Sequence, residues 1–143
     1  MKAQVTLTPA EGKRLIAKAI SCMELVQKAY TDGTLIIATS TTTGYVVEEI
    51  MGKEINKGMF TAGVVTEKGA SITKADGRYK HYVFNRGKLK ECTTPELVPY
   101  LAKMGPDDVM IKGANAIDPY GAAGILLHGS GGGTIGTACG HLI

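Results

Sequence analysis

The sequence of 143 residues contains no tryptophan, only two phenylalanines, and three cysteines without a CxxC pair. An odd number of widely spaced cysteines argues against both a disulfide framework and a zinc site, so we predict no metal. No apolar run approaches the roughly 20 residues of a membrane span, and the N-terminus lacks the pattern of a signal peptide. We therefore expect a cytoplasmic protein without membrane contacts.

Charge of either sign is also in short supply. Sixteen basic and thirteen acidic residues give a net charge of +3, which is too mild to indicate nucleic-acid binding by itself. The length is that of one compact domain, so we expect residues 1–143 to form a single α/β domain. The residue in excess is glycine, with 19 in all and ten between Gly105 and Gly140. A site built from backbone groups is therefore expected in the last quarter of the chain.

Helix signals occur at several points. Thr8 opens a capping-box pattern with proline at the first helical position, which predicts a helix from Pro9. Its apolar residues recur at three- and four-residue spacing and form one stripe: Leu15, Ile16, Ala19, Ile20, Met23 and Val26. Residues 4–7 before it suggest a short edge strand. Further helices are expected over 45–51, after Thr94 as the N-cap, and from Ile135.

Apolar strands alternate with these helices. The run over 34–39 lacks polar alternation, which is typical of a strand buried on both faces in a parallel sheet. Similar runs occupy 59–65, 109–113 and 123–128. Strands that alternate with helices predict an α/β fold with a largely parallel sheet.

The segment 68–90 differs from the rest because it carries seven lysines or arginines and one acid, Asp76. Its residues alternate in polarity over 79–84, and Arg86-Gly87 can turn the chain, so we predict a solvated antiparallel hairpin. Aromatic residues beside cations can stack on nucleic-acid bases. More often such a run is simply a solvated face.

Hydroxyl side chains follow the strand predicted over 34–39. Ligands of open α/β sheets bind at the carboxyl ends of the strands, and a helix N-terminus offers unpaired N–H groups to an anion. The candidate ligand-binding residues here are Thr39, Ser40, Thr41, Thr42, Thr43 and Gly44. The alternative is that one or two of these hydroxyls only cap the following helix.

Two later loops also lie near predicted strand ends. The first supplies Gly113, Asn115 and Asp118; Asn115 is the better ligand contact, because Asp118 before proline also fits an ordinary turn. The second is a glycine cluster over 129–133, where backbone N–H groups can form an anion-binding nest. Its candidate residues are Gly131, Gly132, Gly133 and Thr134. The cluster matches neither a Walker loop nor a dinucleotide fingerprint, and its alternative is a flexible turn.

Residues 32–39 with the hydroxyl run, and residues 109–117 with Gly121 and 133–137, resemble the NagB/RpiA/CoA-transferase-like superfamily, nearest to its initiation-factor-2B-like branch. The resemblance implies a three-layer Rossmann-like fold with a largely parallel sheet, here with a β-hairpin insertion. It also implies sugar phosphates, acyl-CoA or nucleotides bound at the strand ends, commonly in an oligomer. Isomerases of that branch have an acid where this chain has Asn115, and a cysteine in the loop over 40–43. The resemblance therefore supports fold and ligand position more than isomerase chemistry.

Our leading hypothesis is a domain that binds a small anionic metabolite, with phosphate as the favoured anion, and forms a homo-oligomer. A chain that ends at Ile143 is short for this fold, so either its last helix is minimal or a partner subunit completes the sheet. One alternative is an isomerase or an acyl- or CoA-transferase that uses Asp118, Glu67 or Cys139. Another is a nucleic-acid or protein interaction module that uses 68–90. No motif identifies a cofactor.

Overall fold

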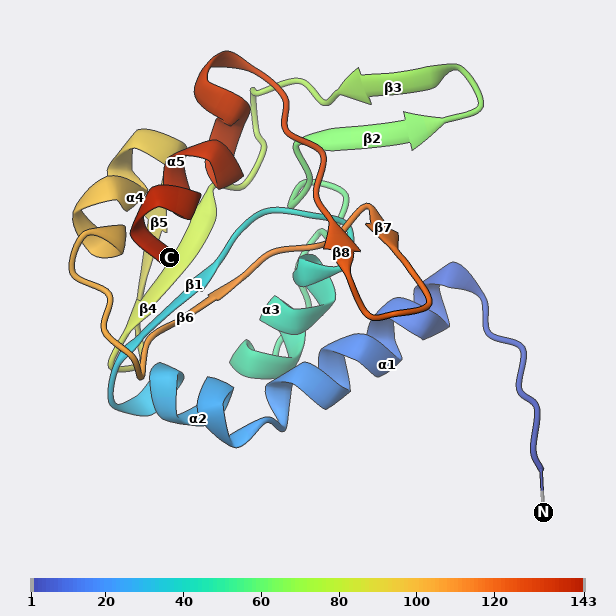
Figure 1. Ribbon diagram of the computed structural model, residues 1–143, viewed down its shortest axis with the longest axis horizontal. Helices are drawn as coiled ribbons and strands as arrows, with labels where there is room; N and C mark the ends of the chain where they lie inside the picture. Colours follow the sequence, from blue (N-terminus) through green and yellow to red (C-terminus); the bar gives the residue numbers. More distant parts are fainter. Residues whose placement is uncertain (1, 143) are drawn as a thin grey trace.

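A mixed four-stranded sheet forms the centre of the molecule (Figure 1). This computed structural model describes residues 2–142, apart from the side chains of residues 65, 66 and 70. The sheet has the order β5-β4-β1-β6; its strands are β1 (Thr34–Ile37), β4 (His81–Asn85), β5 (Lys88–Cys92) and β6 (Val109–Ile111). Strand β1 runs parallel to β6 but antiparallel to β4, and β4 runs antiparallel to β5.

Helices pack on both faces of this sheet. Residues of β1 and β4 alternate between two cores: Leu35, Ile37, Tyr82 and Phe84 belong to one, and Ile36 and Val83 belong to the other. The first core is covered by α1 (Pro9–Ser21), α2 (Glu24–Thr31) and α3 (Thr43–Met51). The second is covered by α4 (Thr94–Leu101) and α5 (Gly133–Leu142).

The prediction of a three-layer Rossmann-like fold with a largely parallel sheet is wrong, because only the β1–β6 pair of the central sheet is parallel. The prediction of a buried strand over 34–39 is confirmed in substance, since Leu35, Ile36 and Ile37 are fully buried. Helices on both faces bury a central strand whether its neighbours run parallel or antiparallel. An unbroken apolar run therefore cannot reveal the direction of the neighbouring strands.

The hairpin predicted within 68–90 exists, but it is not a solvated insertion. Strands β4 and β5 are joined at Arg86 and Gly87, whose φ angles of 49° and 73° suit a tight two-residue turn. Strand β4 then lies between β5 and β1, and its residues from His81 to Phe84 are buried. Its side chains pack against helices on both faces of the sheet, so this strand is part of the core.

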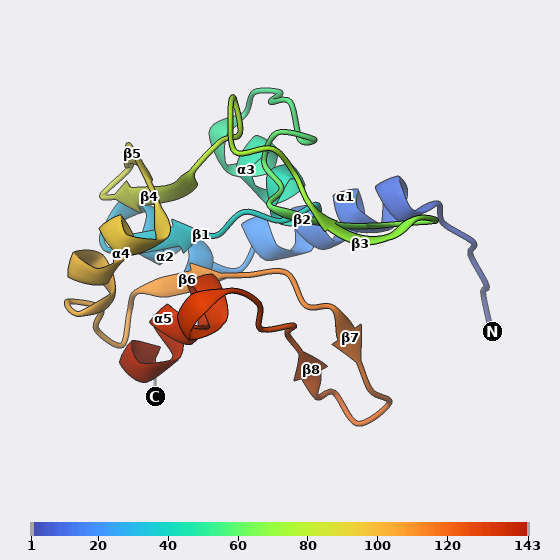
Figure 2. The ribbon, with the colours of Figure 1, turned by 90° about the horizontal axis from the view of Figure 1, so that it is seen from above.

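Two short hairpins lie outside the central sheet. One pairs β2 (Gly63–Thr66) with β3 (Gly69–Ile72) and extends away from the body of the molecule (Figure 1). The other pairs β7 (Ala116–Ile117) with β8 (Ala123–Gly124) and projects on a different side, as Figure 2 shows. The strands expected over 59–65 and 123–128 thus end up in these hairpins, not in a parallel sheet.

The helix predicted from Pro9 is confirmed, with Thr8 and Glu11 forming its capping box. It stops at Ser21, and α2 continues after a break. Its apolar stripe is only partly buried: Leu15 remains 58% exposed and Ile16 48% exposed. Residues 4–7 form no strand.

A buried carboxylate ties α1 to α3. Glu48 on α3 accepts hydrogen bonds from Arg14 of α1, from Lys57 and from the N–H group of Ile55. Arg14 also contacts Glu49 at 2.7 Å. The carboxylate of Glu48 is therefore paired on both of its oxygens, as a buried charge requires.

We predict that Glu48→Gln destabilises the protein at neutral pH. Burial alone would raise the pKa of Glu48, but hydrogen bonds from Lys57, the Ile55 N–H group and Arg14 hold it below the ordinary value of 4.5. The unfolded chain binds more protons in this range, so the contribution of the carboxylate is present above pH 4.5 and is lost as the pH falls further. Breaking such a buried pair costs about 3 kcal/mol.

Urea unfolding at pH 7 and pH 3.5 measures this effect. The matched control is Glu49→Gln, because Glu49 is more exposed and its removal is expected to cost less than about 1 kcal/mol. Equal losses for the two variants at pH 7, or a loss for Glu48→Gln that does not shrink at pH 3.5, would contradict the prediction.

Candidate functional site

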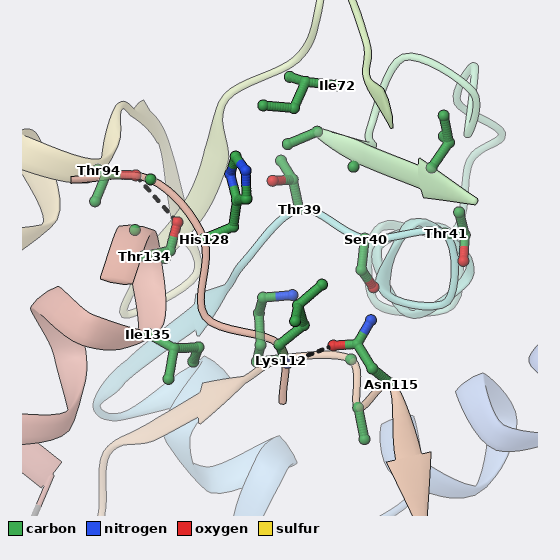
Figure 3. A pocket seen from close by; sticks show the side chains of 18 of the residues that line it. Thr39, Ser40, Thr41, Ile72, Thr94, Lys112, Asn115, His128, Thr134 and Ile135 are labelled. Carbon is green, nitrogen blue, oxygen red and sulfur yellow. Dashed lines mark hydrogen bonds between the residues drawn. The ribbon is translucent and has the colours of Figure 1, made fainter. Parts of the chain in front are cut away.

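A cleft of about 490 Å³ opens at the carboxyl ends of β1 and β6 (Figure 3). This volume lies within the roughly 300–1,000 Å³ of small-molecule sites. Its walls come from the loop after β1, the segment after β6, the β2–β3 hairpin and the N-terminus of α5. Because β1 and β6 are adjacent and parallel, the loops that follow them leave the same edge of the sheet.

The cleft brings together residues from all three predicted loops. Its lining includes Thr39, Ser40, Thr41, Thr42, Gly113, Asn115, Gly132, Gly133 and Thr134. The remaining candidates do not line it: Thr43, Gly44, Asp118 and Gly131. The placement is geometric and leaves ligand binding at these residues a prediction.

The hydroxyl loop after β1 divides into structural and available groups. Ser40 Oγ accepts the N–H groups of Thr42 at 3.3 Å and Thr43 at 3.0 Å, and so caps the start of α3. The Thr43 hydroxyl donates to the carbonyl of Ala38 at 2.6 Å. Within the described residues, the hydroxyls of Thr41 and Thr42 have no hydrogen-bond partner. These two hydroxyls remain available to a ligand.

A buried histidine links the cleft to three elements. His81 Nδ1 accepts the N–H group of Thr39 at 3.1 Å, so the neutral ring carries its proton on Nε2. Nε2 lies 3.1 Å from Thr94 Oγ1 and 3.2 Å from Thr134 Oγ1, and these oxygens are 3.1 Å apart. The Nε2–H group donates to one hydroxyl, which can donate to the other. The second of the two threonine hydroxyls then keeps its own proton, which it can donate into the cleft.

The protonation state of His81 supports this direction of donation. Burial, with a smaller contribution from the positive charges of Lys112 and Arg78, lowers its pKa from 6.5 to about 4. The ring is therefore neutral at pH 7. Thr94 is free for this role because Thr93, one residue earlier than predicted, is the N-cap of α4.

The charge of the cleft is positive. Lys112 follows β6 and Arg78 precedes β4, whereas no aspartate or glutamate is among the described residues that line the cleft. Arg78 is oriented by two 3.3 Å hydrogen bonds from Nη1 to the carbonyl and hydroxyl oxygens of Thr73. The N-terminus of α5 adds the positive end of its dipole. These features together favour an anion.

The glycine cluster over 129–133 forms the wall of the cleft just before α5. Gly129, Gly131, Gly132 and Gly133 all have φ between 63° and 85°, a region that other residues rarely adopt. A Cβ atom on Gly133 would lie 2.7 Å from the carbonyl oxygen of His128. The chain therefore makes a tight turn into α5 that only glycine can adopt. This turn accounts for the glycine cluster over 129–133.

Asn115 and Asp118 have different surroundings. Asn115 Oδ1 accepts the N–H group of Leu126 at 2.9 Å, and its amide nitrogen points toward Ser40 (Figure 3). Asp118 Oδ1 accepts the N–H groups of Tyr120 and Ala122 and shapes the turn between β7 and β8. Asn115 thus holds the segment after β8 against the cleft, and Asp118 forms the turn that its proline also suggests.

The candidate reactive groups of the enzyme alternative are not gathered in the cleft. Glu67 lies between β2 and β3, and Cys139 is exposed on α5. With Asp118, these residues are absent from the described lining. Sequence reasoning placed neither Lys112 nor His81 at the site. The available signal for Lys112 was its position directly after an apolar strand.

The aromatic residues of the segment 68–90 face inward. Tyr82 and Phe84 are buried, and Tyr79 packs against the same core under α1, α2 and α3. Lys90 lies on β5 with its ammonium 5.5 Å from the centre of the Tyr100 ring. Tyr82 and Phe84 are therefore not available to stack on nucleic-acid bases.

Comparisons with protein-family models, with curated proteins and with solved structures find no match to this chain. Over residues 2–142, no helix is long and apolar enough to cross a membrane. The same residues contain no group of three histidine, cysteine or acidic side chains placed to hold a metal ion. The functional inference therefore depends on the cleft itself.

We predict opposite effects for two glycine substitutions in α5. Gly136→Ala places a Cβ atom 1.9 Å from the carbonyl oxygen of Gly131, so the turn or the helix must move, at a cost of about 1–3 kcal/mol. Gly140→Ala meets nothing within 4 Å and is expected to stabilise the protein by about 0.5–1 kcal/mol through its helix propensity. Urea unfolding of both variants measures the difference, and effects of the same sign would contradict this geometry.

We also predict that His81 makes stability depend on pH. Its pKa falls from 6.5 to about 4 on folding, so the unfolded chain binds more protons between these values. Stability therefore falls by about 3 kcal/mol in all as the pH drops from 6.5 to 4. The variant His81→Asn should be less stable at pH 7 and should lose this dependence.

Urea unfolding at pH 7, 6 and 5 checks the His81 prediction. Glu48 does not interfere, because its effect begins below pH 4.5. An unchanged dependence on pH in His81→Asn would show that another group titrates.

Proposed function

We propose that this protein binds a small anionic metabolite, with a phosphate group as the anion, in the cleft at the carboxyl ends of β1 and β6. The observation that carries the proposal is the charge of the described lining: Lys112 and Arg78 without any carboxylate. Two cations that face one cleft repel each other, and an anion between them relieves that repulsion. Screening is weaker in a cleft than on an open surface, which strengthens the attraction.

Hydrogen-bond donors suited to phosphate surround these charges. The planar guanidinium of Arg78 and the hydroxyls of Thr41 and Thr42 are all donors, and the positive end of the α5 dipole lies at the same cleft. The Thr94 and Thr134 pair adds the hydroxyl proton that the neutral His81 ring directs outward. A phosphate group has enough acceptor oxygens to use several of these donors at once.

The cleft also offers apolar surface beside its charged part. The apolar side chains in its lining are those of Ala62, Val64, Ile72, Ala114, Leu126 and Ile135. A ligand with a charged end and a less polar body would use both surfaces. The volume of about 490 Å³ suits a metabolite of the size of a sugar phosphate or a nucleotide.

Homo-oligomer formation remains part of the proposal. Apolar side chains are exposed around the β7–β8 pair, where Tyr120 is 94% and Ile117 78% exposed, and Leu126 and Leu127 are also exposed. Neighbouring exposed apolar residues favour contact with another protein surface. The superfamily resemblance stays a prediction, and the anion site does not depend on it. An isomerase or transferase activity also stays open, but the predicted reactive residues Asp118, Glu67 and Cys139 are not among the described residues that line the cleft.

We predict that phosphorylated metabolites stabilise the protein against heat. The experiment screens inorganic phosphate, sugar phosphates, nucleoside monophosphates and CoA esters by thermal shift. A ligand at 100 times its dissociation constant adds about 2.7 kcal/mol to the free energy of unfolding. Arg78→Gln should weaken that stabilisation because it removes a charged fork from the cleft.

The matched control is Lys53→Gln, which removes one positive charge from an exposed position outside the cleft. It should leave ligand stabilisation intact. If no anion shifts the unfolding temperature, or if both variants weaken binding equally, the cleft is not the specific anion site proposed.

A further inference from the structure

We propose that Lys112 is a nucleophile that forms a reversible imine with an aldehyde or ketone group of the bound anionic metabolite. This inference rests on the proposed function, because the anion brings the carbonyl group into the cleft. The proposal assigns the ligand a second chemical feature besides its phosphate, namely a carbonyl carbon. Three observations support it: the position of Lys112, its lack of a carboxylate partner, and the donors around it.

The position of Lys112 is well defined. It follows Ile111, whose carbonyl accepts the N–H group of Ala38 at 3.0 Å at the end of the β1–β6 pair. On its other side lies Gly113, where a Cβ atom would be 2.7 Å from Ser40 Oγ. The backbone on both sides of Lys112 is therefore held against β1 and its loop. From there the Lys112 side chain extends into the cleft (Figure 3).

Three other lysines among the described residues pair with carboxylates, but Lys112 does not. Lys18, Lys28 and Lys57 each lie within 3.7 Å of an aspartate or glutamate oxygen. Among the described residues, no such partner contacts Lys112. Burial lowers its pKa, so a larger share of its amine is unprotonated than on an exposed lysine. Desolvation without a counter-ion is how proteins prepare lysine for imine formation.

The chemistry balances without an oxidant or a reductant. The lone pair of the unprotonated Lys112 Nζ attacks the carbonyl carbon, and the C=O π electrons move to oxygen. A proton passes from nitrogen to that oxygen and gives a carbinolamine. A proton from solvent on its hydroxyl lets the C–O bond break, and water leaves as the nitrogen lone pair forms the C=N bond. The resulting iminium returns one proton to solvent and gives the imine. The hydroxyls of Thr94 and Thr134 are donors placed in the same cleft.

Reductive trapping tests the proposal. The intact protein is incubated with glyceraldehyde 3-phosphate and cyanoborohydride at neutral pH, and the labelled residue is located by mass spectrometry of peptides. We expect one equivalent of adduct, at Lys112 before any other lysine, and suppression of it by excess glycerol 3-phosphate. The rate at Lys112 should also level off at a lower pH than the rate at exposed lysines, because its pKa is lowered by burial.

Two variants control the trapping. Lys112→Arg keeps the positive charge but has no amine that forms a stable imine, so the adduct should be lost. Lys53→Arg changes an exposed lysine and should leave labelling unchanged. The mapping on the unaltered protein needs no variant, so it decides the question even if Lys112→Arg does not fold.

The outcomes separate this inference from the proposed function. Stabilisation by glycerol 3-phosphate with labels spread evenly over exposed lysines would overturn the imine and leave the anion site standing. If Lys112 only attracts the anion by its charge, glycerol 3-phosphate also stabilises the protein and Lys112 is also not labelled selectively. No stabilisation by any anion and no selective label would overturn both. Selective, competed labelling of Lys112 that is lost in Lys112→Arg supports both.

Discussion

The parallel pairing of β1 with β6 is the contact on which the site depends. It brings the carboxyl ends of two strands far apart in sequence to one edge of the sheet, with Ile37 opposite Ile111. The loop that begins at Thr39 and the segment that begins at Lys112 then face the same cleft. The pairing is held by buried apolar side chains on both faces of β1, so the apolar cores also determine the position of the polar groups.

A neutral histidine behind the cleft serves two physical needs. Its two ring nitrogens satisfy the N–H group of Thr39 and the hydroxyls of Thr94 and Thr134, which would otherwise be poorly solvated. Its low pKa also avoids a third positive charge beside Lys112 and Arg78. The site therefore keeps two cations near a set of oriented donors, an arrangement whose electrostatic energy improves when an anion arrives.

Local patterns were enough to predict several elements and to single out loops that line the cleft. The capping box at Thr8, the buried run after Thr34 and the turn at Arg86-Gly87 each follow from short-range chemistry, and the structure contains all three. The hydroxyl and glycine loops were also predicted to lie at strand ends. Capping, turn geometry and hydrophobic periodicity act over a few residues, and so they can be found without knowledge of the fold.

The pairing of strands and the roles of single side chains required the tertiary structure. An apolar strand buried on both faces carries no mark of its neighbours' direction, so β4 was taken for an exposed hairpin, although it is the antiparallel neighbour of β1. Likewise, whether a polar group faces a cleft depends on segments distant in sequence. Asp118 closes a local turn, whereas Lys112 enters the cleft without a carboxylate partner among the described residues. Long-range packing decides which polar groups are already satisfied and which remain available for chemistry.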